Sequence, residues 1–449
     1  MEKLFFKKIE LWLVGLIVVL LILGAIAFGN VVVHTMKGGT KAGIIGEGAL
    51  WISNIPTFLK KLDQAEYFKV GVSKHEGKSG FAFGYAAGSR PNAGYLLLSR
   101  YDGDDKRPYV ELVDMNAQMV IHRWAPDTDA IFASARNESF YVDLVKDRHL
   151  ARMILRHPYV TETGSIISKA GTPLFRIDAC SKLEWLNDDH FYHHSLETDA
   201  EGYLWTASTI EPTQVEKVDK EGFLDDGIAK LSLDGTLLEN KSLTEIFLEN
   251  DMEYVIYGNG HYYYDPTHLN DVQPVHSDGL VWKKGDLFLS MRSPSMVALY
   301  RPSTGKIIWH QAGPWIHQHD VDILDDRRIA IYDNNAGEFY RHRGTFGTVE
   351  VLIYDFETGE ITSPWKDALA KHNVLAETEG LYRIFPDGSL FLEEQNHGRL
   401  MQVQQDGDLV WEYVNRAGDG RVYRVAWSRF FTNEEAAPFV AAIGKANCG

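Results

Sequence analysis

Four stretches of the sequence carry residue types that can bind or transfer an anion. They are HFYHHSLETD, with His190, His193 and His194; YYYDPTHLNDV, with Asp265, His268 and Asn270; LFLSMRSPSMV, with Arg292; and WIHQHDVDILDDRRIAIYDNN, with His317, His319 and Asn334. Imidazole can act as nucleophile, acid or base near neutral pH, and a guanidinium offers a fixed fork of donors. Three histidines could instead bind zinc. Because Arg292 would be a poor neighbour for a metal cation, we expect an anion site without metal or cofactor.

The spacing of three of these histidines favours a shared site. Any one of the 17 histidines is most simply structural or solvated. His194, His268 and His319, however, each come just before or at the start of a predicted strand, in similar places of different repeats. Their convergence on one axis is therefore expected.

The repeats are pairs of β-rich runs separated by a polar turn and often closed by Trp. Six copies begin near residues 109, 172, 227, 295, 349 and 398. A second hairpin pattern accompanies several of them, as in HSLETDAEGYLWTAS, HQHDVDILDDRRIAIYD and LYRIFPDGSLFLEE. Two hairpins give the four strands of one propeller blade, whereas a β-solenoid has shorter repeats. The sequence thus predicts an all-β, six-bladed β-propeller over residues 76–449, ending in a short helix or a ring-closing strand from Asn433.

The N-terminus predicts a membrane segment. Residues 1–10 contain three lysines and form a cytoplasmic stub, and residues 11–29 are uncharged and close to the ~20 residues that span a bilayer. A cleaved signal peptide is the alternative, but this apolar run is longer than a signal core. Residues 30–75 are expected to be a juxtamembrane linker with a short amphipathic helix near residues 49–62. In a bacterium, this predicts a single-pass inner-membrane protein whose N-terminus is cytoplasmic and whose propeller is periplasmic.

Charge and cysteine content limit the partners. The net charge of −17, without a basic stripe, argues against nucleic acid. The two cysteines, Cys180 and Cys448, do not form a disulfide framework. They either pair with each other or are two unrelated thiols. The aromatic residues Tyr257, Tyr262, Tyr263, Tyr264 and Trp315 either line a phenol pocket or, for most of them, pack between strands.

The motifs together resemble a known family. The ordered string DPTHLNDV, LFLSMRSPSMVALYRPSTGKIIW and QHDVDILDDRRIAIYDNN is similar to the bacterial PAPS-independent arylsulfotransferases, and the resemblance covers roughly residues 110–420. The resemblance implies a six-bladed propeller that moves a sulfuryl group from an aryl sulfate to a phenol. It implies that the histidine of the QH motif, His319, becomes a sulfohistidine.

The resemblance also implies the rest of the site. His268, Arg292 and one histidine of the pair His193–His194 would hold the sulfuryl group, and we favour His194 because Ser195 then begins the strand. Asn270 would contact substrate with His193. Apart from the resemblance, Tyr264 of the aromatic run and His397, from a loop of the sixth repeat, are also expected to contact substrate. The chain departs from the family in having an apolar helix where soluble members carry an N-terminal domain. The alternative is therefore an inactive propeller that serves as a binding subunit of a membrane complex.

Overall fold

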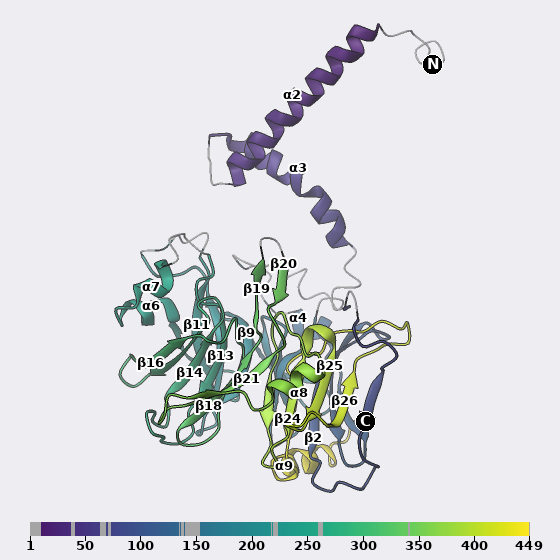
Figure 1. The fold of residues 1–449 in the computed structure, drawn as a ribbon, viewed down its shortest axis with the longest axis vertical. Coiled ribbons are helices and arrows are strands. Elements are labelled where there is room, and N and C mark those ends of the chain that lie inside the picture. The colour runs from purple at the N-terminus through teal and green to yellow at the C-terminus, as the bar shows by residue number, and fades with distance from the viewer. Residues whose placement is uncertain are drawn as a thin grey trace. The chain divides into compact units, whose positions relative to one another are not determined.

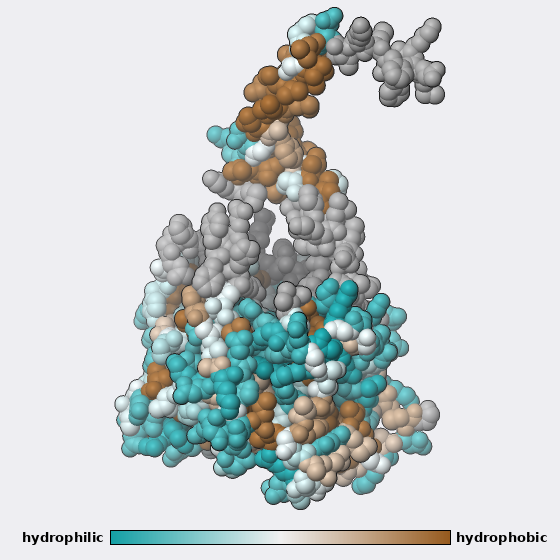
Figure 2. All heavy atoms as spheres, turned by 45° about the vertical axis from the view of Figure 1, so that its right-hand side comes forward, coloured by the Kyte–Doolittle hydropathy of each residue, from teal (hydrophilic) through white to brown (hydrophobic). Residues whose placement is uncertain are grey.

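The computed structural model describes residues 10–36, 41–62, 69–70, 73–133, 135, 139, 153–216, 218, 223–258, 264–339 and 342–448. Residues 1–66 and 67–449 form two separate compact units. The first holds the helices α2 (Leu11–Met36) and α3 (Gly43–Leu62). The apolar span predicted over 11–29 thus continues as helix to Met36, and the amphipathic helix begins at Gly43. At about 1.5 Å per residue, α2 is long enough to cross a ~30 Å hydrocarbon layer; its exposed surface is almost wholly apolar (Figure 2).

The second unit is a six-bladed β-propeller (Figure 1). The strands of each blade are given from the channel outward. Blade 1 consists of β27 (Arg429–Phe431), β2 (Tyr95–Asp102), β3 (Arg107–Asp114) and β4 (Met119–Trp124), and blade 2 of β5 (Arg156–Val160), β6 (Ile166–Lys169), β7 (Leu174–Ile177) and β8 (Leu183–Asn187). Blade 3 consists of β9 (Phe191–Thr198), β10 (Leu204–Ile210), β11 (Asp225–Leu231) and β12 (Leu237–Ser242). In blades 4 to 6 they are β13 (Leu269–Pro274), β14 (Leu287–Met291), β15 (Met296–Arg301) and β16 (Lys306–Ala312); β17 (Val321–Ile323), β18 (Arg328–Asp333), β21 (Glu350–Asp355) and β22 (Ile361–Thr362); and β23 (Tyr382–Ile384), β24 (Leu390–Glu394), β25 (Arg399–Val403), β26 (Leu409–Val414) and β1 (Gly80–Phe83).

The remaining elements are short connections. They comprise the hairpin β19 (Ala336–Phe339) and β20 (His342–Thr345), and the helices α4 (Thr128–Phe132), α6 (Leu243–Leu248), α7 (Glu253–Tyr257), α8 (Lys366–Lys371), η3 (Gln395–His397) and α9 (Asn433–Ile443). The ring closes twice. The N-terminal strand β1 pairs with β26, and the C-terminal strand β27 pairs with β2. The closing strand therefore precedes Asn433, which begins the helix α9.

The hydrophobic core lies between the blades. Because side chains of a strand alternate between its two faces, each blade packs against both neighbours. In β14, Leu287 and Leu289 pack towards blade 3, whereas Phe288 packs towards blade 5. The six large clusters of buried side chains each join two adjacent blades. A disulfide between Cys180 and Cys448 ties the residues after α9 to blade 2, which decides between the two readings of these cysteines.

The innermost strands leave one edge facing the channel, so their backbone N–H groups need acceptors there. Buried polar side chains of the neighbouring blade supply them. Leu196 N donates to His157 Nδ1 (3.1 Å) and Val272 N to Ser195 Oγ (3.1 Å). Val321 N donates to a carboxylate oxygen of Asp271 (3.1 Å). These links fix the inner strands against one another, and so fix the residues at their ends.

Candidate active site

Each inner strand has a residue in the left-handed backbone conformation, either within the strand or up to four residues before it. In blades 1 to 6 these residues are Trp427, His157, His194, His268, His317 and Glu379, with φ between +46° and +61°. Side chains other than glycine adopt this conformation at a cost of ~1–3 kcal/mol each, and such residues gather at functional sites. His194 and His268 are thus equivalent, as the sequence suggested. The equivalent in blade 5 is His317, and His319 lies two residues further on.

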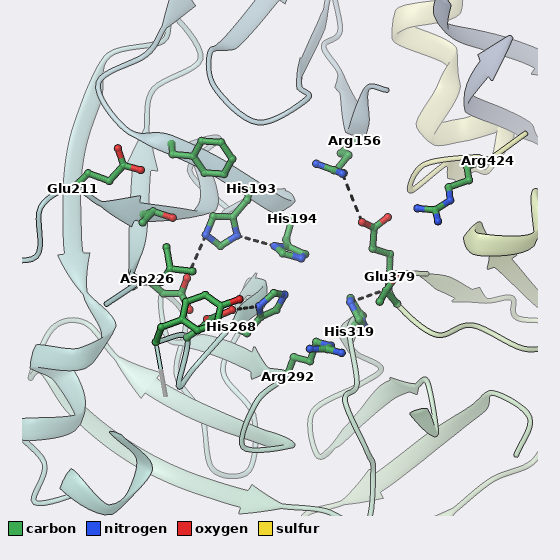
Figure 3. Close-up of a pocket in the computed structure, with 16 residues that line it drawn as sticks. Arg156, His193, His194, Glu211, Asp226, His268, Arg292, His319, Glu379 and Arg424 are labelled. Carbon is green, nitrogen blue, oxygen red and sulfur yellow. Dashed lines mark hydrogen bonds and ion pairs between the residues drawn. The ribbon is translucent and has the colours of Figure 1, made fainter. Parts of the chain in front are cut away.

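A cavity of about 640 Å³ opens at this end of the channel. His194, His268, Arg292 and His319 all line it, although they come from three blades (Figure 3). The His194 ring centroid lies 5.1 Å from that of His268 and 6.2 Å from that of His319. Where β9 pairs with β10, Ala207 lies opposite His193 and Thr206 lies opposite Leu196. His194 therefore lies in a β-bulge, a feature that changes the direction of side chains.

His319 is held at both ring nitrogens. Asn334 donates from Nδ2 to the carbonyls of Ala376 (3.2 Å) and Glu379 (2.8 Å), which turns its Oδ1 towards His319. His319 Nδ1 therefore donates to Asn334 Oδ1 (2.7 Å), and its Nε2 accepts from the backbone N–H of Glu379 (2.8 Å). The ring is thus the tautomer whose lone pair is on Nε2, the nitrogen that can act as a nucleophile.

The other two histidines are each linked to an acidic residue, His268 directly and His194 through His193. His268 Nδ1 donates to Asp265 Oδ2 (2.5 Å), an arrangement that strengthens a histidine as a base. His194 Nδ1 hydrogen-bonds His193 Nδ1 (2.7 Å), and His193 Nε2 lies 3.1 Å from the carbonyl of Ser208 and 3.3 Å from Asp226 Oδ1. A proton taken up by His193 would reverse the bond between the two rings and leave His194 Nε2 as a donor.

Burial sets the charge of these groups. Burial lowers the pKa of His319 well below 6.5, and the nearby charges of Arg292 and His268 lower it further, against the hydrogen bond of Asn334. Burial, followed by the charges of His193 and His268, lowers the pKa of His194 in the same way. Burial is the largest single influence on the pKa of Asp226 and would raise it, but the hydrogen bonds from His193 and Thr267 and the charges of His193 and His268 together outweigh burial, and the pKa is lowered. His319 and His194 are therefore neutral at pH 7.

Among the nearby charges, Arg292 has the largest effect on the pKa of His319, which it lowers. It follows β14, is almost fully buried, and its backbone N–H donates to the carbonyl of His268 (3.0 Å). This bond ties the turn that carries Arg292 to the segment that carries His268. A buried guanidinium beside a neutral imidazole can hold an anion against a nucleophile.

Of the residues expected to contact substrate, His193 and Tyr264 line the cavity, and Tyr264 is more than half exposed. Asn270 does not line it; the Asn270 side chain is fully buried and donates to the carbonyl of Gln318 (2.7 Å), which positions the backbone before His319. His397 also lies outside the lining, with Nε2 3.4 Å from Glu377.

The aromatic residues divide as the packing alternative expected. Trp315 is buried in the core between blades 4 and 5, Tyr257 does not line the cavity, and Tyr262 and Tyr263 lie outside the described residues. Asp320, next to His319, lines a different cavity of about 520 Å³. Among the described residues, no group of three or more His, Cys, Asp or Glu is arranged to hold a metal ion.

Sequence reasoning missed several charged residues of the lining: Arg156, Glu211, Asp226, Glu379 and Arg424. None lies in a recognisable motif, and each reaches the cavity only because the ring brings its blade there. The Asp265–His268 pair was visible in the sequence, because its spacing of three residues lies within one of the motifs.

A family model described as arylsulfotransferase (ASST) matches residues 173–416. No curated protein matches the chain.

Among solved structures, a protein of unknown function from Bacteroides caccae is 10% identical with a TM-score of 0.46, covering 74% of this chain and 98% of its own. Virginiamycin B lyase from Staphylococcus aureus is 12% identical with a TM-score of 0.33, covering 58% of this chain and 70% of its own. Neither likeness carries a functional argument.

Proposed function

Since the chain belongs to the arylsulfotransferase family, we propose that it transfers a sulfuryl group from an aryl sulfate to a phenol through a covalent intermediate on His319. The observation that carries this proposal is the cavity in which neutral His319, with its lone pair on Nε2, faces Arg292, His268 and His194. An aryl sulfate has one negative charge spread over three oxygens, and this set of donors matches it.

In the first half-reaction, His319 Nε2 attacks sulfur, and the bond between sulfur and the aryl oxygen breaks. The leaving phenolate takes a proton from His268, which Asp265 orients through Nδ1. The ring of His319 keeps its Nδ1 proton, which forms a hydrogen bond to Asn334 Oδ1. The ring therefore carries a positive charge while sulfur is bound to Nε2. By analogy with phosphoryl transfer, catalysis here is mainly positioning and charge stabilisation.

In the second half-reaction, the oxygen of an acceptor phenol attacks sulfur and the bond to His319 Nε2 breaks. His268 now takes the phenol proton, which restores both histidines to their starting states. Arg292 donates to the sulfuryl oxygens in both halves, and His194 Nε2 donates to them when His193 carries the proton that reverses the bond between the two rings. In the resting site the backbone N–H of Glu379 donates to the lone pair of His319 Nε2 (2.8 Å), so this hydrogen bond must open before Nε2 attacks sulfur. The freed N–H can then donate to an oxygen of the bound group.

The N-terminal helix also indicates where in the cell the protein is located. We propose that α2 anchors the chain in the inner membrane as a single pass, with residues 1–10 cytoplasmic and the propeller in the periplasm. The three lysines before the helix favour this orientation. The Cys180–Cys448 disulfide fits it too, since disulfides persist mainly in oxidising compartments.

Steady-state kinetics test the proposal. The full chain in detergent, given para-nitrophenyl sulfate and a phenol, should show parallel double-reciprocal lines, the sign of a covalent intermediate. His319→Ala should abolish turnover. His310→Ala is the matched control, since His310 lies on the outer strand β16, does not line the cavity and hydrogen-bonds Tyr254 (2.9 Å). No turnover by the wild type, or an unchanged rate in His319→Ala, would sink the proposal. A co-purifying partner without turnover would favour the binding-subunit alternative.

A further inference from the structure

One wall of the cavity carries two arginines in addition to Arg292, which is the arginine expected to hold the sulfuryl group. Arg156, Glu379 and Arg424 line it together, contributed by blades 2, 6 and 1 (Figure 3). In the close-up, the three side chains lie near one another above His319, whereas Glu211 lies far to the left, beyond His193 and His194. Two guanidinium groups and one carboxylate leave an excess of one positive charge at this wall.

The pairing of these groups is incomplete. Arg156 Nη2 lies 3.7 Å from Glu379 Oε1, a long contact for an ion pair. Among the described residues, Arg424 has no carboxylate within ion-pair distance, and its Nε is buried without an acceptor. The Nε of Arg156 is in the same state. By contrast, the buried Arg399 is paired with Glu394 at 2.7 Å.

The rest of the cavity decides where a second anionic group can lie. Phe191, Leu224 and Tyr264 offer apolar and aromatic surface, and Glu211 would repel an anion on its side. The volume of about 640 Å³ is well above what a sulfuryl group needs and suits a substituted aromatic ring. An anion on that ring would therefore find its donors at Arg156 and Arg424.

We propose that Arg424, with Arg156, forms a subsite for a carboxylate carried by the phenolic substrate, so that phenolic acids are the preferred acceptors. The proposal rests on the function proposed above. A carboxylate matches the fork of a guanidinium and can accept two N–H bonds from it.

The test compares two acceptors that differ only in charge: para-hydroxyphenylacetate and para-hydroxyphenylacetamide. The methylene group separates the substituent from the ring, so their phenol acidities are matched. Wild type should prefer the acid by about tenfold or more in kcat/KM, the scale of a charge-assisted hydrogen bond. Arg424→Gln should bring this ratio close to one, and Arg424→Lys should keep part of it. Arg421→Gln, an exposed arginine three residues away that is outside the lining, should keep the full ratio.

Binding measured without donor separates this proposal from the proposed function. Calorimetric titration of the wild type should show the same preference for the acid, lost in Arg424→Gln, whether or not sulfuryl transfer occurs. The release of para-nitrophenol in a single turnover reports the first half-reaction independently. Equal binding of acid and amide by the wild type, or an unchanged ratio in Arg424→Gln, would overturn the subsite even where that release is normal.

Discussion

Asn334→Ala removes the hydrogen bond that supports the nucleophile without touching the substrate. Asn334 accepts the Nδ1 proton of His319 (2.7 Å), and its amide also donates to the carbonyls of Ala376 and Glu379. While sulfur is bound, the His319 ring is positively charged, so the bond from Nδ1 becomes charge-assisted and is worth ~1.5–3 kcal/mol. The loss should lower kcat by about 10- to 150-fold.

The assay is single-turnover release of para-nitrophenol, which isolates the formation of the intermediate. Asn334→Asp should instead raise the pKa of His319, because a carboxylate favours the charged ring, and should move the acid limb of the pH profile to higher pH. Asn335→Gly is the matched control, since Asn335 is adjacent, has positive φ, and its side-chain amide donates to the carbonyl of Thr348 (3.3 Å). A wild-type single-turnover rate in Asn334→Ala, with the fold intact, would refute this account of His319.

Further predictions follow from other contacts. Asp265→Asn keeps an acceptor for His268 but removes its charge, so we expect the rate to depend more steeply on the acidity of the leaving phenol, measured over a series of aryl sulfates. Because burial lowers the pKa of His319 well below 6.5, the single-turnover rate at pH 6.5 should be close to its maximum; a midpoint at or above 6.5 would contradict this. The Glu393 carboxylate accepts hydrogen bonds from the N–H groups of Trp427 and Ser428 before the closing strand β27, and burial raises its pKa to about 7. Glu393→Gln should therefore lower the free energy of unfolding by denaturant by ~1–3 kcal/mol. An unchanged free energy of unfolding would contradict this role. Replacing Cys180 and Cys448 by Ser should lower stability by ~2–5 kcal/mol and abolish the effect of reductant on Tm; a Tm unaffected by reductant in the wild type would contradict the disulfide.

The fold was largely predictable, because each blade repeats one physical pattern. All six copies found in the sequence are the third and fourth strands of a blade, counted from the channel, such as β15–β16. In each, a polar turn separates two runs that pack on neighbouring blades. The inner pairs were visible only in part, as in β17–β18. Inner strands carry polar residues such as Ser195 and Asp271 that accept N–H groups across the channel, and these interrupt the apolar pattern.

The candidate site was predictable where chemistry and motif coincide. His194, His268, Arg292 and His319 were all found from the sequence, and they do line one cavity. Asn270 belongs to a motif as well, but its side chain holds a backbone carbonyl. The charged wall was not predictable, since Arg156, Glu379 and Arg424 meet only through closure of the ring.

The most direct test of the account is the site of covalent attachment. The full chain, incubated with an aryl sulfate and no acceptor, should gain the mass of one SO₃ group, and peptide mapping should place it on the imidazole of His319. Addition of phenol should remove it, and His319→Ala should never acquire it. Sulfuryl transfer without a covalent adduct, or an adduct on another residue, would contradict the account.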